Sequence, residues 1–224
     1  MKRKSKLTIA CSALLLAAVV VGGTFAYFYD SMTVTNEFTT AGNDDPSKGV
    51  DIEVTEPGFD EEEAKDVLPG DVIAKDPTVK NNKGDAYVRF VVRLVDKESQ
   101  EVITDQARAN KILSMIVYNE SLDDTEKYDS TAVDGMPSMN TTQFTLDSTR
   151  SEVGEYYYNY NGVFSNGATA VLFTHVIVPT DWNQTDIATL GNFDIVVVGQ
   201  AIQADNMADA DEAFKALDGE LAGN

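Results

Sequence analysis

The sequence has very little of the side-chain chemistry from which most enzyme sites are built. Its 224 residues include one cysteine, Cys11, and one histidine, His175. A disulfide needs two cysteines, and a catalytic zinc ion usually takes three protein ligands, most often histidines. The composition therefore excludes a disulfide within the chain and gives poor support to a zinc peptidase.

Basic residues are also scarce. The chain has 17 Lys and Arg residues against 37 Asp and Glu residues, and its formal net charge is -20. A protein that binds nucleic acid needs a basic surface to neutralise phosphates, and a chain this acidic repels polynucleotides and anionic lipids. Nucleic acid is therefore excluded as a partner, and we interpret the acidic surface as a source of solubility.

The motifs of nucleophilic and nucleotide-dependent catalysis are missing as well. There is no H-E-x-x-H, no G-x-S-x-G, no P-loop and no G-x-G-x-x-G. Paired carboxylates, which glycosidases use, carry no information among 37 acidic residues because chance pairs are expected everywhere. His175 lies in a predicted strand, where a structural or surface role is typical. We identify no catalytic residue and predict a protein that is not an enzyme.

The chain begins with the pattern of an export signal. Four of the first six residues are basic, and an uncharged apolar run follows over residues 7–28. Small residues before Tyr27 have the spacing that a signal peptidase reads, so we predict cleavage between Ala26 and Tyr27. The alternative is a retained membrane anchor, because about 20 apolar residues cross a bilayer. Cleavage removes four basic residues and no acidic one, which changes the net charge from -20 to -24.

The rest of the sequence follows mainly a period of two, which is typical of half-buried strands. In residues 86–95, the side chains of Val88, Phe90 and Val92 share a wholly apolar face and are predicted to lie in a core. Further strands are predicted at residues 50–55, 72–80, 143–146, 169–178 and 193–203. Turns rich in Pro, Gly, Asn and Asp separate them. The pattern predicts a mainly β fold, an antiparallel β-sandwich.

Two short peripheral helices are predicted beside the strands. Apolar residues at i, i+3, i+4 and i+7 indicate one helix within residues 105–117, and the same spacing indicates a second at residues 210–217. Asp205 and Asn206 are candidate caps of the second helix, and Gly219 is predicted to end it. Each helix is expected to pack one face on the sheets.

Calcium is the one metal for which oxygen ligands are abundant. The candidate ligands are Asp44 with Asp45 and Asp123 with Asp124. No complete EF-hand loop is present, and solvated acidic loops account for most such clusters. We therefore expect no resident cofactor and retain calcium as an alternative.

Four tyrosines within residues 156–160 form the only aromatic cluster that suggests a ligand. Stacked aromatic rings can bind sugars, and a buried or edge cluster is the alternative. Glycan binding is the lesser of these two interpretations.

The segment that follows the predicted cleavage site alternates apolar and polar residues. Phe28, Met32, Val34 and Phe38 stand at alternate positions within residues 27–38. The segment is either an ordinary first strand of the sandwich, which composition favours, or a strand lent to a neighbouring subunit. Strand addition of the second kind gives open filaments when the contact is head to tail.

Eight short stretches, in this order, resemble the TasA and camelysin family of secreted fibre-forming proteins. They are GGTFAYF at 22–28, NEFT at 36–39, VDIEVTEP at 50–57, LPGD at 68–71, KDPTVKN at 75–81, DAYVR at 85–89, LFT at 172–174 and AIQAD at 201–205. Together they touch most of the chain, although residues 122–140 show no family pattern.

This resemblance implies a jelly-roll-like sandwich, processing by a SipW-type signal peptidase, and export to the cell surface or extracellular matrix. It implies a signal peptide at 1–26, a donor-strand segment at 27–38 and a single sandwich domain at 39–224. The expected partners are other copies of the chain in a head-to-tail polymer, the signal peptidase and other matrix components, with membrane contact only before cleavage.

The resemblance also leaves rival functions open. Camelysins have been described as metallopeptidases, so a secreted metal-dependent peptidase is one alternative to a fibre subunit. A monomeric surface adhesin that binds glycans is another. No sequence motif of a zinc site is present to receive the peptidase activity.

Overall fold

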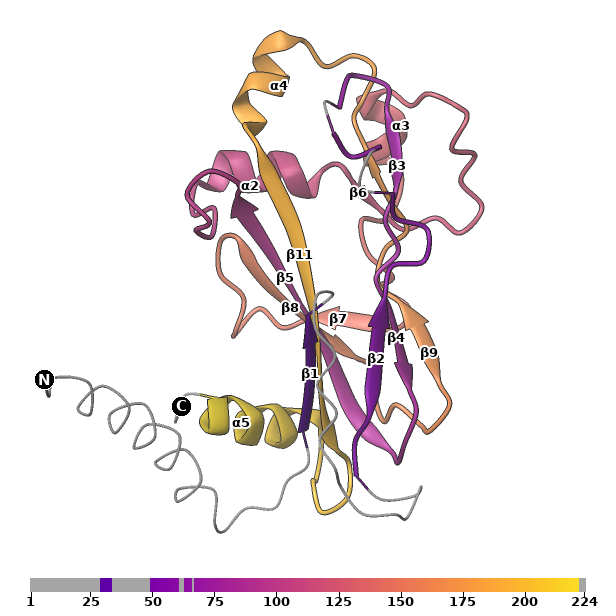
Figure 1. Cartoon of the computed structure of the whole chain (residues 1–224), viewed down its shortest axis with the longest axis vertical. Helices are drawn as coiled ribbons and strands as arrows, with labels where there is room; N and C mark the ends of the chain where they lie inside the picture. Colours follow the sequence, from indigo (N-terminus) through magenta and orange to yellow (C-terminus); the bar gives the residue numbers. More distant parts are fainter. Residues whose placement is uncertain (1–28, 34–48, 61–62, 66, 222–224) are drawn as a thin grey trace, which may run out of the picture.

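The structure, a computed structural model, describes residues 29–33, 49–60, 63–65 and 67–221. Its largest element is a five-stranded antiparallel sheet (Figure 1). The strands follow one another across the sheet in the order β1 (Tyr29–Thr33), β11 (Phe193–Gln203), β5 (Ala86–Asp96), β8 (Glu155–Tyr160) and β7 (Phe144–Leu146). The two long strands β5 and β11 pair over their whole length and form the centre of the sheet.

Two three-stranded sheets form the opposite layer. One has the order β2 (Ile52–Thr55), β4 (Thr78–Asn81), β9 (Thr169–Val171), and the other the order β3 (Val72–Ala74), β10 (His175–Ile177), β6 (Ile116–Val117). In Figure 1 they lie one above the other beside the long strands. The predicted mainly β sandwich is therefore confirmed.

Two predicted strands are each divided between the two small sheets. Residues 72–80 form β3 and β4, and residues 169–178 form β9 and β10. At the crossing, the amide of Lys75 donates to the carbonyl of Thr174 and the amide of Leu172 donates to Pro77, both at 3.0 Å. The prediction of two continuous strands was wrong. The alternation of side chains continues where residues 72–80 and 169–178 pass from one small sheet to the other, so the sequence pattern does not mark the break.

Four helices occur in the described part of the chain: α2 (Gln106–Leu113), α3 (Ser130–Asp134), α4 (Gln184–Leu190) and α5 (Ala210–Leu221). α2 begins after Asp105, whose carboxylate accepts a hydrogen bond from the amide of Arg108 at 2.7 Å. It ends earlier than predicted because the chain then enters β6. α3 and α4, which are both short, were not predicted from the sequence.

The predicted carboxyl-terminal helix is present as α5, with different ends. The carboxylate of Asp209 caps it by accepting from the amide of Glu212 at 2.9 Å. Asp205 and Asn206 are therefore not the caps, and Asn206 has a positive φ of 66° in the preceding turn. Gly219 does not end the helix, since it keeps helical backbone and α5 continues to Leu221.

The core lies between the two layers. Val88, Phe90 and Val92 are fully buried there. The other face of β5 is also covered, because α5 packs over it with Phe214 and Leu217 against Tyr87 and Ile202. Two outward residues of β5, Tyr87 and Arg89, are therefore buried under α5, whereas the side chain of Arg93 farther along the strand is 43% exposed.

No helix in the described residues is long and apolar enough to cross a membrane. The predicted leader, the cleavage site at Ala26 and Tyr27, and the assembly residues Phe28, Val34 and Phe38 lie outside the described residues.

Candidate functional site

The first described strand, β1, lies at the edge of the large sheet. Among the described residues it pairs only with β11, from Tyr29 opposite Ile202 to Thr33 opposite Val198. Met32, the one predicted assembly residue inside β1, pairs with Gly199. An edge strand is held by a single ladder of backbone hydrogen bonds, and an equivalent strand from another chain can form the same ladder.

Gly199 allows the second layer to approach the acceptor strand closely. A Cβ atom at this position would lie 2.4 Å from Cγ2 of Val54 and 3.5 Å from Cδ1 of Ile52. Both residues belong to β2, which also contacts β1. The backbone of β11 is therefore packed directly under β2 at the position where Met32 pairs.

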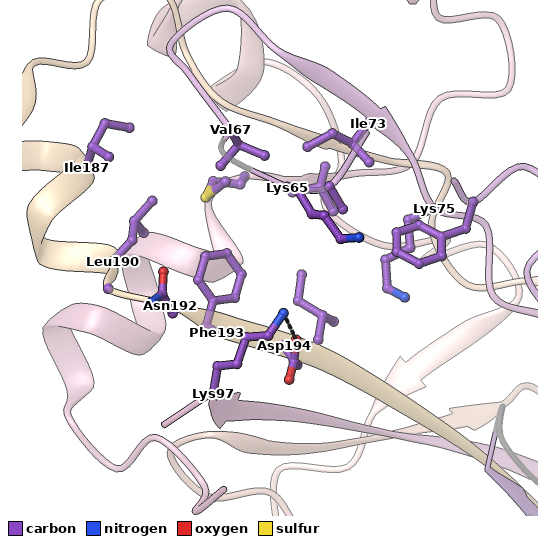
Figure 2. A pocket seen from close by; sticks show the side chains of 16 residues that line it. Lys65, Val67, Ile73, Lys75, Lys97, Ile187, Leu190, Asn192, Phe193 and Asp194 are labelled. Carbon is purple, nitrogen blue, oxygen red and sulfur yellow. Dashed lines mark ion pairs between the residues drawn. The ribbon is translucent and has the colours of Figure 1, made fainter. Parts of the chain in front are cut away.

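Beyond β1, the same edge of β11 is open. In the part of the chain that the structure describes, no strand pairs with this edge from Phe193 to Val197, although β5 pairs along the opposite edge. Beside it lies a cleft of about 640 Å³ (Figure 2). The side chains that form its apolar walls include Val67, Ile73, Met115, Ile187, Leu190 and Phe193.

Three of the few basic residues line this cleft. Lys75 is buried and paired with Glu56 at 2.7 Å, and its ammonium lies 4.5 Å from the ring centroid of Phe59. Lys97 approaches Asp194 at 3.8 Å, with both side chains largely exposed (Figure 2). An exposed pair at this distance contributes little stability, so the Lys97 ammonium can move away from Asp194 at a small cost in free energy. The third basic residue is Lys65.

On the outer face of the large sheet, a buried arginine holds α5 in place. The Arg89 side chain is 1% exposed, and its Nε donates to Gln200 Oε1 at 2.7 Å. Its guanidinium also pairs with Asp218 of α5 and lies 4.8 Å from the ring centroid of Phe214. Arg150 Nε donates to the same Asp218 carboxylate at 2.7 Å. Two cations thus converge on one carboxylate of the last helix.

The Asp218 carboxyl group has a pKa below its ordinary value. Burial raises this pKa, but hydrogen bonds and charge interactions with Arg89 and Arg150 outweigh the burial. The ionised form is therefore favoured in the folded protein. The sequence pattern did not reveal this network. Its one signal was Arg89, an arginine between the apolar residues Val88 and Phe90.

The described residues do not fit a metal centre. They contain no group of three or more His, Cys, Asp or Glu side chains placed to hold a metal ion. His175 is half-buried, its Nδ1 lies 2.8 Å from Thr174 Oγ1, and burial lowers its pKa. Neither the sole histidine nor the carboxylates of this part of the chain supply a zinc ligand set.

The calcium candidates divide into two groups. Asp123 accepts hydrogen bonds from the amide and hydroxyl of Thr125 at 3.0 and 2.6 Å, which closes a local turn. These hydrogen bonds lower the pKa of Asp123. Asp124 follows in the same exposed turn, whereas Asp44 and Asp45 lie outside the described residues.

The tyrosine cluster forms β8, a strand that the sequence analysis did not predict, and its side chains point to both faces of the sheet. Tyr156, Tyr158 and Tyr160 pack against the core cluster. Tyr157 faces the opposite side, where its ring centroid lies 4.9 Å from the Arg89 guanidinium and its hydroxyl donates to Glu155 at 2.6 Å. Consecutive tyrosines therefore do not form one stacking platform.

The fold and the edge define the class: an antiparallel β-sandwich whose first described strand lies at a sheet edge and pairs, as far as the structure describes the chain, with one neighbour. Comparison with protein families then matches residues 1–155 to the family described as camelysin metallo-endopeptidase. The chain belongs to that family, as the sequence resemblance indicated. Comparisons with curated proteins and with solved structures found no significant match.

Proposed function

We propose that the protein is a secreted structural subunit of extracellular fibres, in a biofilm matrix or on a cell surface, and that each copy donates its mature amino-terminal strand to the next. The observation that carries this proposal is the position of β1 at the sheet edge, where β11 is its one partner strand in the described part of the chain. Membership of the camelysin family and the leader-like sequence before Tyr27 support export.

Strand donation conserves the interactions that the structure shows within one chain. A β1 strand from a second copy forms the same ladder with β11 as the chain's own β1. Residues 34–51 separate β1 from β2, so β1 can leave without moving a core strand. Each copy then gives one strand and receives one, and a head-to-tail contact of this kind continues into an open filament.

Electron microscopy of negatively stained protein tests this proposal. We compare residues 27–224 with a chain that begins at Thr39, over a range of protein concentrations and with or without calcium. The proposal expects filaments from the longer chain alone. Monomers from both chains under every condition would contradict it and would favour an accessory protein or an adhesin.

A second candidate function follows from the family's description as a metallo-endopeptidase. Hydrolysis of a protein substrate that stops when a chelator is added would support it. If that activity survives in His175→Ala, a zinc site built on the sole histidine is wrong. The fibre proposal expects no hydrolysis by the mature chain.

Export itself has a direct test. We expect mature protein from the culture medium or cell surface to begin at Tyr27, as read by mass spectrometry of its amino-terminal peptide. A retained anchor would instead leave residues 1–26 attached and the protein in the membrane fraction. We propose the SipW-type signal peptidase as the processing partner, and other matrix components as further partners of the fibre.

A further inference from the structure

The open part of the β11 edge begins where the pairing with β1 ends. β1 ends with Thr33 opposite Val198, and the edge continues without a partner strand in the described residues from Val197 back to Phe193. These five positions correspond in number to residues 34–38, which follow Thr33 in the sequence. In an antiparallel strand, alternate backbone groups face such an edge and require a partner or water.

Continuing the observed register gives each of these residues a defined opposite. Val34 would pair with Val197, Asn36 with Ile195 and Phe38 with Phe193, each one step along the ladder that joins Thr33 to Val198. Residues opposite one another across a ladder share a face of the sheet.

That shared face is the buried one. Val197 belongs to the core cluster, and Phe193 and Ile195 pack against it. The continued register therefore places Val34, Asn36 and Phe38 on the core side and directs Thr35 and Glu37 outward. A slip of one residue would reverse both faces, so the alternation of the segment specifies this register.

The cleft lies where the last residue of the segment would arrive. Phe193, Ile195 and Leu190 line it. Figure 2 shows Phe193 and Leu190 on the same cleft as Ile187 and Val67. At about 640 Å³, the cleft has more than enough room for an aromatic side chain, and its apolar walls could contact one. Phe38 is the only aromatic residue in 34–38.

We propose that the Phe193–Val197 edge and its cleft are the acceptor for residues 34–38 of a second copy, bound as a continuation of β1 with Phe38 anchored in the cleft. The proposal deepens the proposed function and rests on it for the identity of the donor. It makes the cleft an anchoring site for the donated strand and Phe38 the residue that fixes its register.

The continued register brings one like-charge pair together at the mouth of the cleft. Glu37 would lie opposite Asp194, and two opposed carboxylates repel each other. Lys97, whose Nζ lies 3.8 Å from Asp194, is the cation that offsets this repulsion.

Engineered cysteine pairs test the register, because the chain has no cysteine other than Cys11 in the leader. In the mature chain we combine Asn36→Cys with Ile195→Cys, and as a control Glu37→Cys with Ile195→Cys, which points the new thiol to the opposite face. Paired strand positions meet the Cα separation that a disulfide requires, so mild oxidation should give at least about tenfold more cross-linking in the first pair than in the control. Gels without reductant and peptide mass spectrometry measure the product.

The outcomes separate this inference from the proposed function. A ladder of cross-linked dimers and higher species from the in-register pair supports both. A disulfide confined to monomers places residues 34–38 on their own β11 edge, which keeps the acceptor and overturns the exchange between copies. Filaments that form without cross-linking, or equal cross-linking in both pairs, overturn the acceptor but leave strand donation by residues 29–33.

A second variant keeps the test independent of the new cysteines. Phe38→Ala should slow filament growth at least about tenfold, since the variant loses the aromatic contacts that anchor the strand. Thr35→Ala, at an outward position, is the matched control and should grow normally. Equal growth of the two variants would contradict the anchoring role of Phe38.

Discussion

Gly199 shows how one residue without a side chain connects the core to the edge of β11 that pairs with β1, which we call the assembly edge. It pairs with Met32 on one side and lies under Val54 and Ile52 of β2. A period-two pattern predicts a strand through residues 193–203, but it does not reveal that β2 presses on this backbone. That contact depends on how the two layers pack, which local alternation does not encode.

Gly199→Ala should therefore destabilise the fold by about 1 to 3 kcal/mol, as overpacking of a core does. The new Cβ would be 2.4 Å from Val54 Cγ2, too close to be accommodated without moving β2. Gly219→Ala is the control, because nothing lies within 4 Å of its added Cβ and the residue is helical. Urea unfolding of both variants measures the difference, and equal midpoints would contradict this account of Gly199.

Asp218 gives the protein an acid-sensitive attachment of α5. Its pKa is depressed in the folded state, so its contribution to stability is present above the ordinary Asp value of about 4 and is lost as the pH falls through the lower folded value. Acid should thus loosen the pairing with Arg89 and Arg150 only below about pH 4.

Asp218→Asn should lower the free energy of unfolding at pH 7 by about 1 to 3 kcal/mol, because buried Arg89 loses a charged partner. The same substitution should make the decline in stability between pH 4 and pH 2 less steep. Urea unfolding across this pH range, with exposed Glu98→Gln as the control, measures both effects. An unchanged acid slope would show that the Asp218 carboxyl group is not the one that titrates.

At the scale of elements, alternation alone predicted the long strands and failed where the chain changes sheets. β5 and β11 were predicted closely, because eleven residues of alternating or apolar pattern admit few other structures. The division of residues 72–80 and 169–178 between two sheets depends on pairing with strands far away in the sequence. The alternation within strands of three or four residues does not indicate which sheet each strand joins. α4 was missed for a related reason: its seven residues bury only Leu190.

Lys97 links the end of β5 to the assembly edge, so its charge should affect assembly more than stability. Lys97→Glu would place a third carboxylate beside Asp194 and the expected position of Glu37, and should slow filament growth by about twofold to fivefold at low salt. Lys80→Glu, an exposed reversal on β4, is the control. Light scattering at low and high salt measures growth; a loss that salt does not reduce would contradict an electrostatic cause.

For the whole molecule, composition and short motifs predicted the class of fold and the family, while the cleft could not be predicted. The cleft is lined by residues between 59 and 195, which only the packing of the two layers brings together. The assembly segment was identified as a candidate from its alternation, but its neighbours were not, because the sequence does not show which edge β1 joins.

The central claim is that the mature amino terminus is a strand exchanged between copies, and a synthetic peptide of residues 27–38 tests it most directly. Added in excess to mature protein, the peptide should occupy acceptor edges, and electron microscopy should show filaments that become shorter and fewer as its concentration rises. A peptide with the same residues in scrambled order is the control. Filaments of unchanged length and number at saturating peptide, or equal inhibition by the scrambled peptide, would contradict strand exchange.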